Sequence, residues 1–316
     1  MGMQGSNLAT GLSWVIGTGI GLSFYIYNIH KSNLIINIKN VKVTKFWFYS
    51  ILLLGFTPFI RNGGVSITFF FFNYCVTKLP LINDRIQLQS PGGFNPNDPN
   101  QLAAAHNYWL SAYAGISPLI GLLWSPMPGI SQAGRTIMGY NYGAHNSKRF
   151  SSAMKVTFIW YVVYLLFISI VMFAVGRYTL GLFAITNGAH YDVLYNGITY
   201  HFIYPKLLDD SSFIMSIQFS MYVFLSTSFI LMTSYLSLNK ALKSIFFALL
   251  RSVIVFLPMI FIFWGISLAT HNPWVFWFTL PTTEVVAAII SIPILIHQFK
   301  NIKNNGFDIK LKSEDK

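Results

Sequence analysis

The stretch Met127–Arg149, MPGISQAGRTIMGYNYGAHNSKR, decides between two interpretations of the chain. Long apolar runs precede and follow it, and it ends on the basic pair Lys148 and Arg149. Its four glycines are Gly129, Gly134, Gly139 and Gly143. Glycine allows two backbones to pack closely or one backbone to bend sharply, and a bend at a membrane boundary must hydrogen-bond its own polar groups. The stretch is therefore either an ordinary glycine-rich loop followed by a helix start or a structured turn between two membrane-spanning helices.

The composition is that of an integral membrane protein. The chain has 316 residues, of which 54% are hydrophobic and 9% charged, and its mean hydropathy is +0.54. Soluble domains are about 25% charged, so this chain has too few charges to cover a surface in water. The single cysteine, Cys75, excludes an internal disulfide and a cysteine-based metal site. We attribute the net charge of +12 to loops at the cytoplasmic face and expect no nucleic-acid partner.

Seven apolar stretches are long enough, at about 20 residues, to cross a bilayer as helices. They cover roughly residues 7–29, 46–77, 108–129, 153–176, 211–238, 244–268 and 275–298. Helices are expected because lipid offers backbone polar groups no partner, and runs such as FFALLRSVIVFLPMIFIFW lack the alternation of a membrane barrel. Gly55 and Pro58 predict a kink in the second span. The predicted fold is an all-α membrane protein with about seven transmembrane helices.

Three polar segments lie outside these spans. Residues 79–107 include SPGGFNPNDPNQ and are predicted to form an exposed loop. Residues 186–210 mix aromatic residues with aspartates and are predicted to hold a short interfacial helix. The polar tail over residues 300–316 is predicted to be disordered and cytoplasmic.

Lysine and arginine residues fall on alternate sides of the predicted helices. One side would hold Lys31, Lys39, Lys42, Lys45, Arg135, Lys148, Arg149, Lys155, Lys240, Lys243, Arg251, Lys300, Lys303, Lys310, Lys312 and Lys316. The other side would hold Lys78, Arg85, Arg177 and Lys206. Because basic loops stay in the cytoplasm, this bias predicts a multi-pass protein of the cell membrane with an outside N-terminus and a cytoplasmic C-terminus. Arg251, near the inner end of its span, is expected to snorkel to the headgroups.

Glu284 is the one acidic residue that we place well inside a predicted span. It follows Pro281, Thr282 and Thr283 in the seventh span. Ionisable groups are costly in a membrane and commonly serve a function there. Glu284 is therefore a candidate for binding a sodium ion or a proton. The alternative is a structural carboxylate that is hydrogen-bonded to a neighbouring helix.

The second span carries a row of polar residues after its proline. Arg61 and Asn62 follow Pro58, and Ser66 and Asn73 lie farther along. Asn62, Ser66 and Asn73 are spaced by 4 and 7 residues, which places them on one helical face. This face either lines a cavity or serves as polar contact between helices.

Two further cavity-lining candidates lie in other spans. Gln218 is a polar residue in the fifth span, and Trp124, like Tyr222, could line a cavity for an apolar cation. Enzyme signatures are missing from the sequence: neither GxxxxGK[ST] nor HExxH occurs, so we expect neither an ATP-driven motor nor a metalloenzyme, and no cofactor or metal.

The central stretch, GISQAGRTIMGYNYGAHNSKRFSSAMK, resembles the motif that follows the eighth helix in the multidrug and toxic compound extrusion (MATE) family. The residues that match this motif are Gly129, Gln132, Arg135, Gly139, Tyr140, Asn141 and Gly143. The resemblance implies a structural or gating role for them. Other stretches are similar in the same order: MQGSNLAT (3–10) to the sixth helix, LLLGFTPFIRN to the seventh, ALLRSVIVFLP to the eleventh and LPTTEVVAAIIS to the twelfth.

The resemblance implies one six-helix lobe of a two-lobe exporter plus one preceding helix. Residues 1–30 would be a helix of the N-terminal lobe, 31–45 a basic cytoplasmic linker, 46–299 the C-terminal lobe and 300–316 the cytoplasmic tail. The N-terminal lobe would then be separate or missing, as in a truncated or split gene product.

The implied activity is export of small organic cations across the bilayer in exchange for sodium ions or protons. Some family members carry a glutamate where this chain has Ser66. Glu284 is therefore the main candidate for ion coupling. Two alternatives stay open: a flippase for lipid-linked sugars, and a non-transporting remnant or scaffold.

Overall fold

The computed structural model describes residues 2–28, 45–89, 95, 97–105, 107–182, 185–195 and 198–306. The chain divides into two compact units, Met1–Ser50 and Ile51–Lys316. The described part of the first unit contains α1 (Gly2–Asn28), a helix of 27 residues without a charged side chain. Its large apolar side chains are exposed along its length, among them Leu12 at 58% and Trp14 at 74%. The predicted linker over residues 31–45 lies outside the described residues, apart from its last residue.

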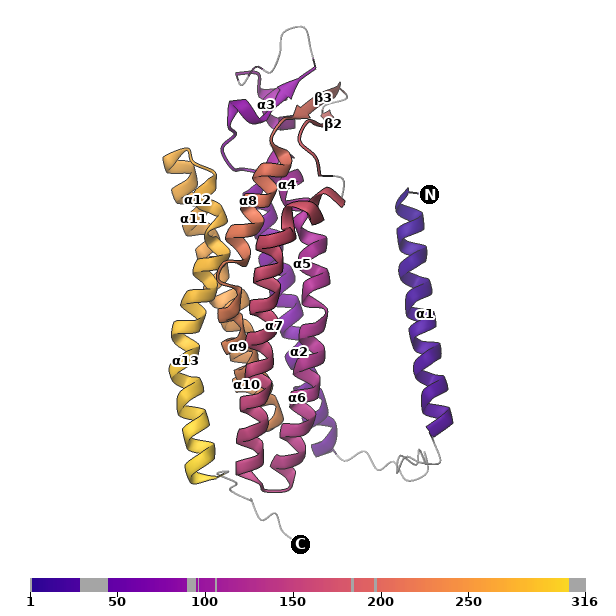
Figure 1. Ribbon diagram of the computed structural model, residues 1–316, viewed down its shortest axis with the longest axis vertical. Helices are drawn as coiled ribbons and strands as arrows, with labels where there is room; N and C mark the ends of the chain where they lie inside the picture. Colours follow the sequence, from indigo (N-terminus) through magenta and orange to yellow (C-terminus); the bar gives the residue numbers. More distant parts are fainter. Residues whose placement is uncertain are drawn as a thin grey trace. The chain divides into compact units, whose positions relative to one another are not determined.

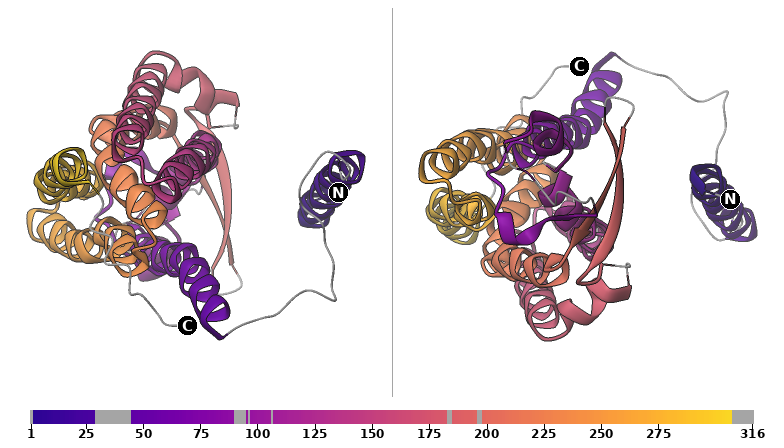
Figure 2. Two further views of the ribbon diagram at one scale, coloured as in Figure 1. Left: turned by 90° about the horizontal axis from the view of Figure 1, so that it is seen from below. Right: turned by 90° about the horizontal axis from the view of Figure 1, so that it is seen from above.

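The second unit is a bundle of long helices with a small cap at one end (Figures 1 and 2). Its helices are α2 (Lys45–Val76, which begins in the first unit), α3 (Pro99–Ala105), α4 (Asn107–Ala114), α5 (Ile116–Trp124), α6 (Pro126–Gly143), α7 (Ser147–Leu182), α8 (Leu207–Phe219), α9 (Leu225–Ser237), α10 (Ala241–Leu249), α11 (Phe256–Thr270), α12 (Trp274–Trp277) and α13 (Thr279–Asn305). Shorter pieces are the 3-10 helices η2 (Asn83–Arg85) and η3 (Tyr222–Phe224) and the π-helical turn η4 (Leu250–Val255).

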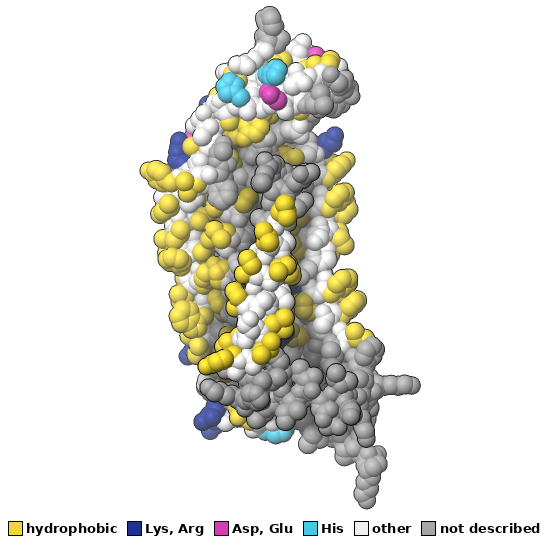
Figure 3. All heavy atoms as spheres, turned by 90° about the vertical axis from the view of Figure 1, so that its right-hand side faces the viewer, with side chains coloured by type: hydrophobic (Ala, Val, Ile, Leu, Met, Phe, Trp, Pro, Cys, Tyr) yellow, Lys and Arg dark blue, Asp and Glu magenta, His cyan; other side chains and the backbone are white. Residues whose placement is uncertain are grey.

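Each of the seven predicted spans overlaps a helical segment, and four of these segments are broken, the seventh being α12–α13. The third span is the run α4–α6, the fifth is α8–η3–α9, and the sixth is α10–η4–α11. Among the described residues, four helical segments are long and apolar enough to cross a membrane by length and composition alone. They are Ser147–Leu182, Leu207–Ser237, Ala241–Thr270 and Trp274–Ile302. In Figure 3, hydrophobic side chains cover the helices between their ends.

The stretch Met127–Arg149 contains less turn than its glycines predict. The expected helix end near residue 129 is wrong, because α6 continues to Gly143 and the connection to α7 is only residues 144–146. His145 has a left-handed φ of 53°, and the Asn146 amide donates to the Asn141 carbonyl at 2.9 Å, which closes the end of α6. The Asn146 side chain then accepts the Arg149 amide at 3.0 Å and caps α7. The stretch is thus a tight junction between two long helices.

Gly134 allows α6 and α7 to pack closely. A Cβ atom at this position would lie 2.6 Å from two side-chain atoms of Thr157 on α7. Thr157 is buried, stiff at χ1, and hydrogen-bonded to the Ala153 carbonyl at 2.8 Å. We therefore expect Gly134→Ala to lower the free energy of unfolding by about 1–3 kcal/mol, the usual cost of overpacking. Gly139→Ala is the matched control, since its Cβ would meet nothing within 4 Å. Thermal unfolding in detergent measures both, and an equal response of the two variants would contradict this packing.

The cap contains a three-stranded antiparallel sheet that the sequence did not predict. Its strands are β1 (Gln87–Leu88), β2 (Ala189–Tyr195) and β3 (Ile198–Tyr204), in the order β1-β3-β2. The interfacial helix expected within residues 186–210 is therefore wrong for all but the start of α8. Tyr200, Phe202 and Tyr204 alternate with more exposed residues, and this period of two favours a strand. The expected loop over 79–107 carries η2, β1 and α3, and α13 extends the helix through Asn305 into the predicted tail.

A charged network holds the cap on the bundle. The buried Asp210 carboxylate of α8 accepts hydrogen bonds from the Tyr108 hydroxyl at 2.6 Å and from Arg85 Nε at 3.1 Å. Arg85 also pairs with Asp84, which accepts a bond from Lys206 at 2.8 Å. The Lys206 hydrogen bond, aided by the nearby positive charges, holds the pKa of Asp84 below its usual value. Asp84 therefore stabilises the fold at pH values above its unfolded-state pKa, and this stabilisation is lost as the pH falls through its folded-state pKa. The stabilisation is small because Asp84 is half exposed.

Candidate functional site

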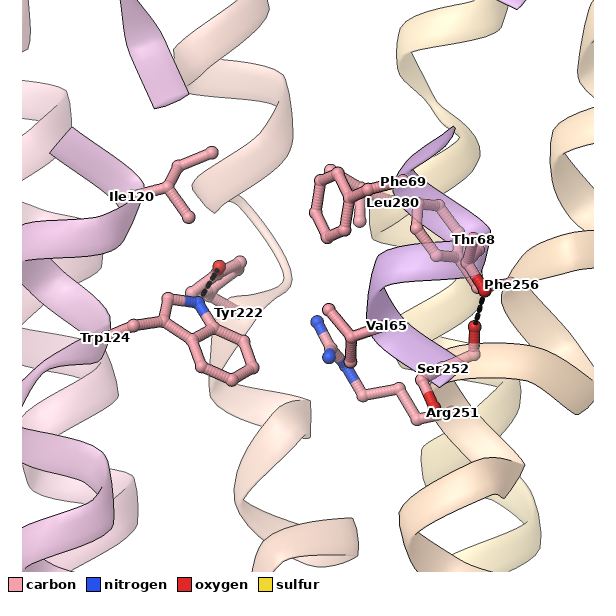
Figure 4. A pocket seen from close by; sticks show the side chains of 10 residues that line it. All are labelled: Val65, Thr68, Phe69, Ile120, Trp124, Tyr222, Arg251, Ser252, Phe256 and Leu280. Atoms are coloured by element: carbon pink, nitrogen blue, oxygen red, sulfur yellow. Dashed lines mark hydrogen bonds between the residues drawn. The ribbon is translucent and has the colours of Figure 1, made fainter. Parts of the chain in front are cut away.

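Two neighbouring cavities open inside the second unit, and they share four lining residues. The upper cavity, of about 120 Å³, is lined by Val65, Thr68, Phe69, Ile120, Trp124, Tyr222, Arg251, Ser252, Phe256 and Leu280 (Figure 4). The lower cavity, of about 160 Å³, is lined by Arg61, Asn62, Val65, Trp124, Ser228, Phe229, Met232, Phe247, Ala248, Arg251 and Ser252. Both cavities are lined by α2, α5 and the α10–η4–α11 segment. Residues of η3 and α13 complete the upper cavity, and residues of α9 complete the lower one.

Arg251 lies at the point where the two cavities meet, and it is paired with Glu284. Its Nε and Nη2 atoms both donate to Oε1 of Glu284, at 2.6 and 2.5 Å. The Glu284 side chain is 1% exposed and that of Arg251 is 15% exposed. The other carboxylate oxygen, Oε2, is buried and has no hydrogen-bond partner among the described residues. Arg251 thus contacts one oxygen of the buried carboxylate, and no described residue donates to the other.

The π-helical turn η4 places Arg251 in this position. Arg251 and Ser252 lie within η4, where the backbone widens, and the Ser252 carbonyl accepts a hydrogen bond from the Thr68 hydroxyl of α2 at 2.7 Å. Single π-turns inside α-helices are common at functional sites, since they redirect side chains and free backbone groups. The expectation that Arg251 snorkels to the headgroups is wrong. Its guanidinium points into the bundle because Glu284 supplies a counter-charge there.

Aromatic residues surround the guanidinium of Arg251. Its central carbon lies 5.2 Å from the centre of the Trp124 ring, which is within the range of a cation–π contact. Trp124 Nε1 donates to the Tyr222 hydroxyl at 2.7 Å, and Figure 4 shows Arg251 extending toward these two rings. The upper cavity is therefore an aromatic chamber, in which Arg251 is the one cationic group among the described lining residues.

Arg61 brings a second positive charge to the lower cavity. Its Nε and Nη2 atoms both lie 3.3 Å from the Asn62 side-chain oxygen. No carboxylate within the described ranges forms an ion pair with Arg61, whereas Arg251 is paired with Glu284. Two arginines line the two neighbouring cavities, and Glu284 lines neither but pairs with Arg251 beside them. This part of the bundle therefore carries a net positive charge when Glu284 is ionised.

The structure brings only some of the predicted cavity residues together. Arg61, Asn62 and Trp124 line cavities. Ser66 and Asn73 are exposed along α2, where Ser66 donates to the Asn62 carbonyl at 3.0 Å. Gln218 lines neither cavity. It is 1% exposed, and neither of its amide atoms has a hydrogen-bond partner in the described part of the chain.

The motif residues lie along α6, away from both cavities. They are Gly129, Gln132, Arg135, Gly139, Tyr140, Asn141 and Gly143. Asn141 is buried, and its side-chain amide donates a hydrogen bond to the Ile137 carbonyl at 2.8 Å. Tyr140 is 77% exposed. The Arg135 carbonyl accepts a hydrogen bond from the Ser237 hydroxyl of α9 at 3.4 Å. Their visible role is to shape α6 and its junctions with α7 and α9.

Sequence reasoning missed Arg251, Thr68 and Ser252 as parts of the site. A usable signal for Arg251 was present, because an arginine and a glutamate in two adjacent spans can neutralise each other in lipid. The role of Thr68 and Ser252 depends on the widened backbone of η4. No pattern of residues in the sequence indicates this widening.

Comparisons with known proteins agree on one family. The MatE family model matches residues 106–262. An uncharacterized protein, the MG447 homolog MYCGA2290 of Mycoplasmoides gallisepticum, is 25% identical over 83% of this chain and 40% of its own length. The uncharacterized protein MG447 of Mycoplasma genitalium is 24% identical over 76% of this chain and 38% of its own length. The chain therefore spans about two fifths of the curated relatives that it matches.

Solved structures share the fold. An outward-facing multidrug resistance MATE family transporter of the MOP superfamily superposes with a TM-score of 0.71 at 15% identity, over 94% of this chain and 56% of the other. A MOP superfamily transporter from Pyrococcus furiosus, described as having a binding pocket of reverse polarity that suggests a different function, superposes with a TM-score of 0.72 at 14% identity and equal coverage.

The family model covers α4 through the first half of α11, which includes the tight α6–α7 junction and the η4 turn that positions Arg251. Members of this family are transporters and not enzymes. The chain thus belongs to the MATE family of membrane transporters and corresponds to part of the length of its relatives.

Proposed function

We propose that this chain forms the C-terminal lobe of a secondary active transporter that exports organic cations in exchange for sodium ions or protons. Glu284 would be the ion-binding carboxylate. The observation that carries the proposal is the Arg251–Glu284 pair beside the cavities, with Oε2 of Glu284 buried and without a donor from the described residues.

An ion at Glu284 would change the position of Arg251. Among the described residues, Arg251 is the charged partner of the Glu284 carboxylate, through Oε1. A proton or a sodium ion at Oε2 would neutralise that charge and weaken its attraction for the guanidinium. Arg251 would then be free to move within the cavity beside Trp124. Ion binding and cavity shape are thereby linked, as antiport requires.

The backbone around the pair is suited to two arrangements. Arg251 lies in the π-helical turn η4, and Tyr222 lies in η3, which separates α8 from α9. Broken helices of this kind form the ion and substrate sites of many secondary transporters. A one-residue change in register at η4 would redirect Arg251 without unfolding either neighbouring helix.

The aromatic chamber supports a substrate with an apolar cation. Phe69, Trp124, Tyr222 and Phe256 present ring surfaces to the upper cavity. Rings stabilise cations by their electron-rich faces, so an organic cation could replace the guanidinium of Arg251 over Trp124. The cavity volume of about 120 Å³ holds only part of a drug-sized molecule. The rest would contact a facing N-terminal lobe, to which we also assign α1.

We also propose an orientation of the chain in the cell membrane. The basic end of the second unit comprises the α6–α7 and α9–α10 connections and the end of α13, where Lys148, Arg149, Lys240, Lys243 and Lys300 lie. The positive-inside rule favours a cytoplasmic position for this end. The cap with its β-sheet would then face outward.

The test is ethidium efflux from cells that express the chain together with an N-terminal lobe. We expect Glu284→Gln to abolish the ion-dependent part of efflux. Thr282→Val is the matched control, because Thr282 lies nearby on α13 and its hydroxyl donates to the Phe278 and Thr279 carbonyls, at the start of the same helix. The double variant Arg251→Gln/Glu284→Gln removes both charges and tests coupling without an unpaired arginine. Ion-dependent efflux that persists in both Glu284 variants would remove Glu284 from the mechanism.

A second candidate is a flippase for lipid-linked sugars, whose phosphate groups are anionic. It is favoured by Arg61, which lines the lower cavity without an acidic partner among the described residues. The two candidates predict opposite effects of Arg61→Gln. Removing a positive charge should leave ethidium efflux unchanged or faster under cation export, but should reduce flipping of a fluorescent lipid-linked sugar at least tenfold under the second candidate. Asn73→Gln, an exposed change on the same helix, is the control.

A further inference from the structure

A groove lies between α7 and α13 at the basic end of the second unit, separate from the two cavities above. It has a volume of about 320 Å³. Its lining residues are Met154, Lys155 and Phe158 of α7, Ile230 of α9, and Leu295, Ile296, Phe299 and Lys300 of α13. Six of the eight side chains are apolar, and Met154 and Ile230, at 1% and 0% exposed, form a buried floor. We call this feature the α7–α13 groove.

The two charged residues of the groove are both cationic. Lys155 and Lys300 are exposed, come from different helices and line the same depression. Neither forms an ion pair among the residues that the structure describes, where the printed pairs involve other residues. The described acidic residues lie at the cap (Asp84, Asp98, Asp192, Asp209 and Asp210) or inside the bundle (Glu284). The groove is therefore complementary to an anion.

The surface around the groove is apolar. On α7, Ile159, Val163 and Phe167 are 47%, 49% and 60% exposed, and on α13, Ile289 and Ile296 are 65% and 49% exposed. Such a surface faces lipid tails in a membrane protein. A groove that opens on it is reached from the bilayer more readily than from water.

We propose that the α7–α13 groove binds one anionic phospholipid. An acyl chain lies on Met154, Phe158 and Ile230, and the phosphate lies between Lys155 and Lys300. Snorkelling alone would explain either lysine. It does not explain why the two lysines meet at one groove with a buried apolar floor. Basic pockets between spanning helices at the cytoplasmic side are where anionic headgroups bind.

The groove also lies where three helices meet. Polar contacts tie α9 to α13 on the side facing the interior: Ser234 and Gln298 exchange hydrogen bonds at 3.1 and 3.3 Å. Ile230 lies one turn before Ser234 on α9, and Phe299 follows Gln298 on α13. A lipid in the groove would fill the gap on the outer side of the same contact and hold α7 against α9 and α13.

The test is native mass spectrometry of the purified chain in detergent with added dioleoyl phosphatidylglycerol or dioleoyl phosphatidylcholine. We expect one phosphatidylglycerol molecule to be retained in preference to phosphatidylcholine. Each lysine near a headgroup contributes about 1 kcal/mol, so Lys155→Gln/Lys300→Gln should weaken phosphatidylglycerol binding roughly 30-fold and abolish the preference. Glycerol phosphate, which has the headgroup chemistry without tails, should not compete at equal concentration.

Lys148→Gln/Lys240→Gln is the matched control. It removes the same charge from the same end of the bundle, from exposed residues that do not line the groove. We expect its binding to equal that of the unchanged chain. Equal retention of the two lipids, equal losses in both double variants, or full competition by glycerol phosphate would each overturn the proposal. The readout is binding, so its outcome is independent of whether Glu284 couples transport.

Discussion

Replacing Glu284 by Gln is expected to lower the free energy of unfolding by about 3–5 kcal/mol. The variant leaves Arg251 mostly buried, with a side chain 15% exposed, and without a counter-charge. Breaking a buried ion pair from one side has this cost because the remaining charge stays desolvated. Thermal or chemical unfolding in detergent measures the effect.

The paired variant Arg251→Met/Glu284→Leu gives the opposite result. It removes both charges and retains apolar volume, so we expect its stability to lie within about 1 kcal/mol of the unchanged chain, or above it. Ion-dependent transport should nevertheless be lost in both variants. Equal destabilisation by the single and the paired variants would contradict the ion pair. Full transport by the paired variant would reduce the pair to a structural contact.

Replacing Asp210 by Ala is expected to lower the free energy of unfolding of the cap by about 3 kcal/mol. Asp210 accepts hydrogen bonds from Tyr108 at 2.6 Å and Arg85 at 3.1 Å. The Asp210 side chain is 6% exposed and that of Arg85 is 17% exposed. Without the carboxylate, the buried Tyr108 hydroxyl loses its partner, and the mostly buried Arg85 guanidinium keeps only the half-exposed Asp84 as a counter-charge. Limited proteolysis between η2 and β3, together with the melting temperature, measures the change.

Asp209→Asn is the control for this prediction. Asp209 precedes Asp210 and pairs with Arg177 at 2.7 Å, but the side chains of that pair are 43% and 58% exposed. Exposed ion pairs contribute only about 0–1 kcal/mol. A larger loss for Asp209→Asn than for Asp210→Ala would show that the cap is not held by the buried network.

The helices of the bundle were predictable because a bilayer excludes other backbone structures. The ends of these helices were less predictable. The run through Met127–Gly143 was expected to break near Gly129, yet α6 continues because its glycines face close neighbours or open surface and leave the backbone hydrogen bonds intact. Glycine marks both turns and close helix contacts, and the sequence does not separate these two uses.

The cap was missed for a different reason. The strands β2 and β3 together contain four tyrosines, and tyrosine is also enriched at membrane interfaces. Their pairing with each other and with β1, from Gln87 to Ile203, depends on contacts between distant parts of the chain. No local pattern encodes such a contact.

The candidate site was predictable in its chemistry and not in its geometry. Glu284, Arg61 and Trp124 were identified as unusual residues within apolar spans, and the structure places all three at or beside the two cavities. That Arg251 turns inward to meet Glu284 depends on the π-turn η4. Snorkelling was the default expectation for a lone arginine near a helix end.

Ion binding at Glu284 is the claim on which the proposed transport depends. Its most direct measurement is equilibrium binding of radioactive sodium, together with proton uptake, on the purified chain and on Arg251→Gln/Glu284→Gln. We expect the unchanged chain to bind about one sodium ion or to take up about one proton at this site, and the double variant to bind neither there. Unchanged sodium binding and proton uptake in the double variant would contradict this claim.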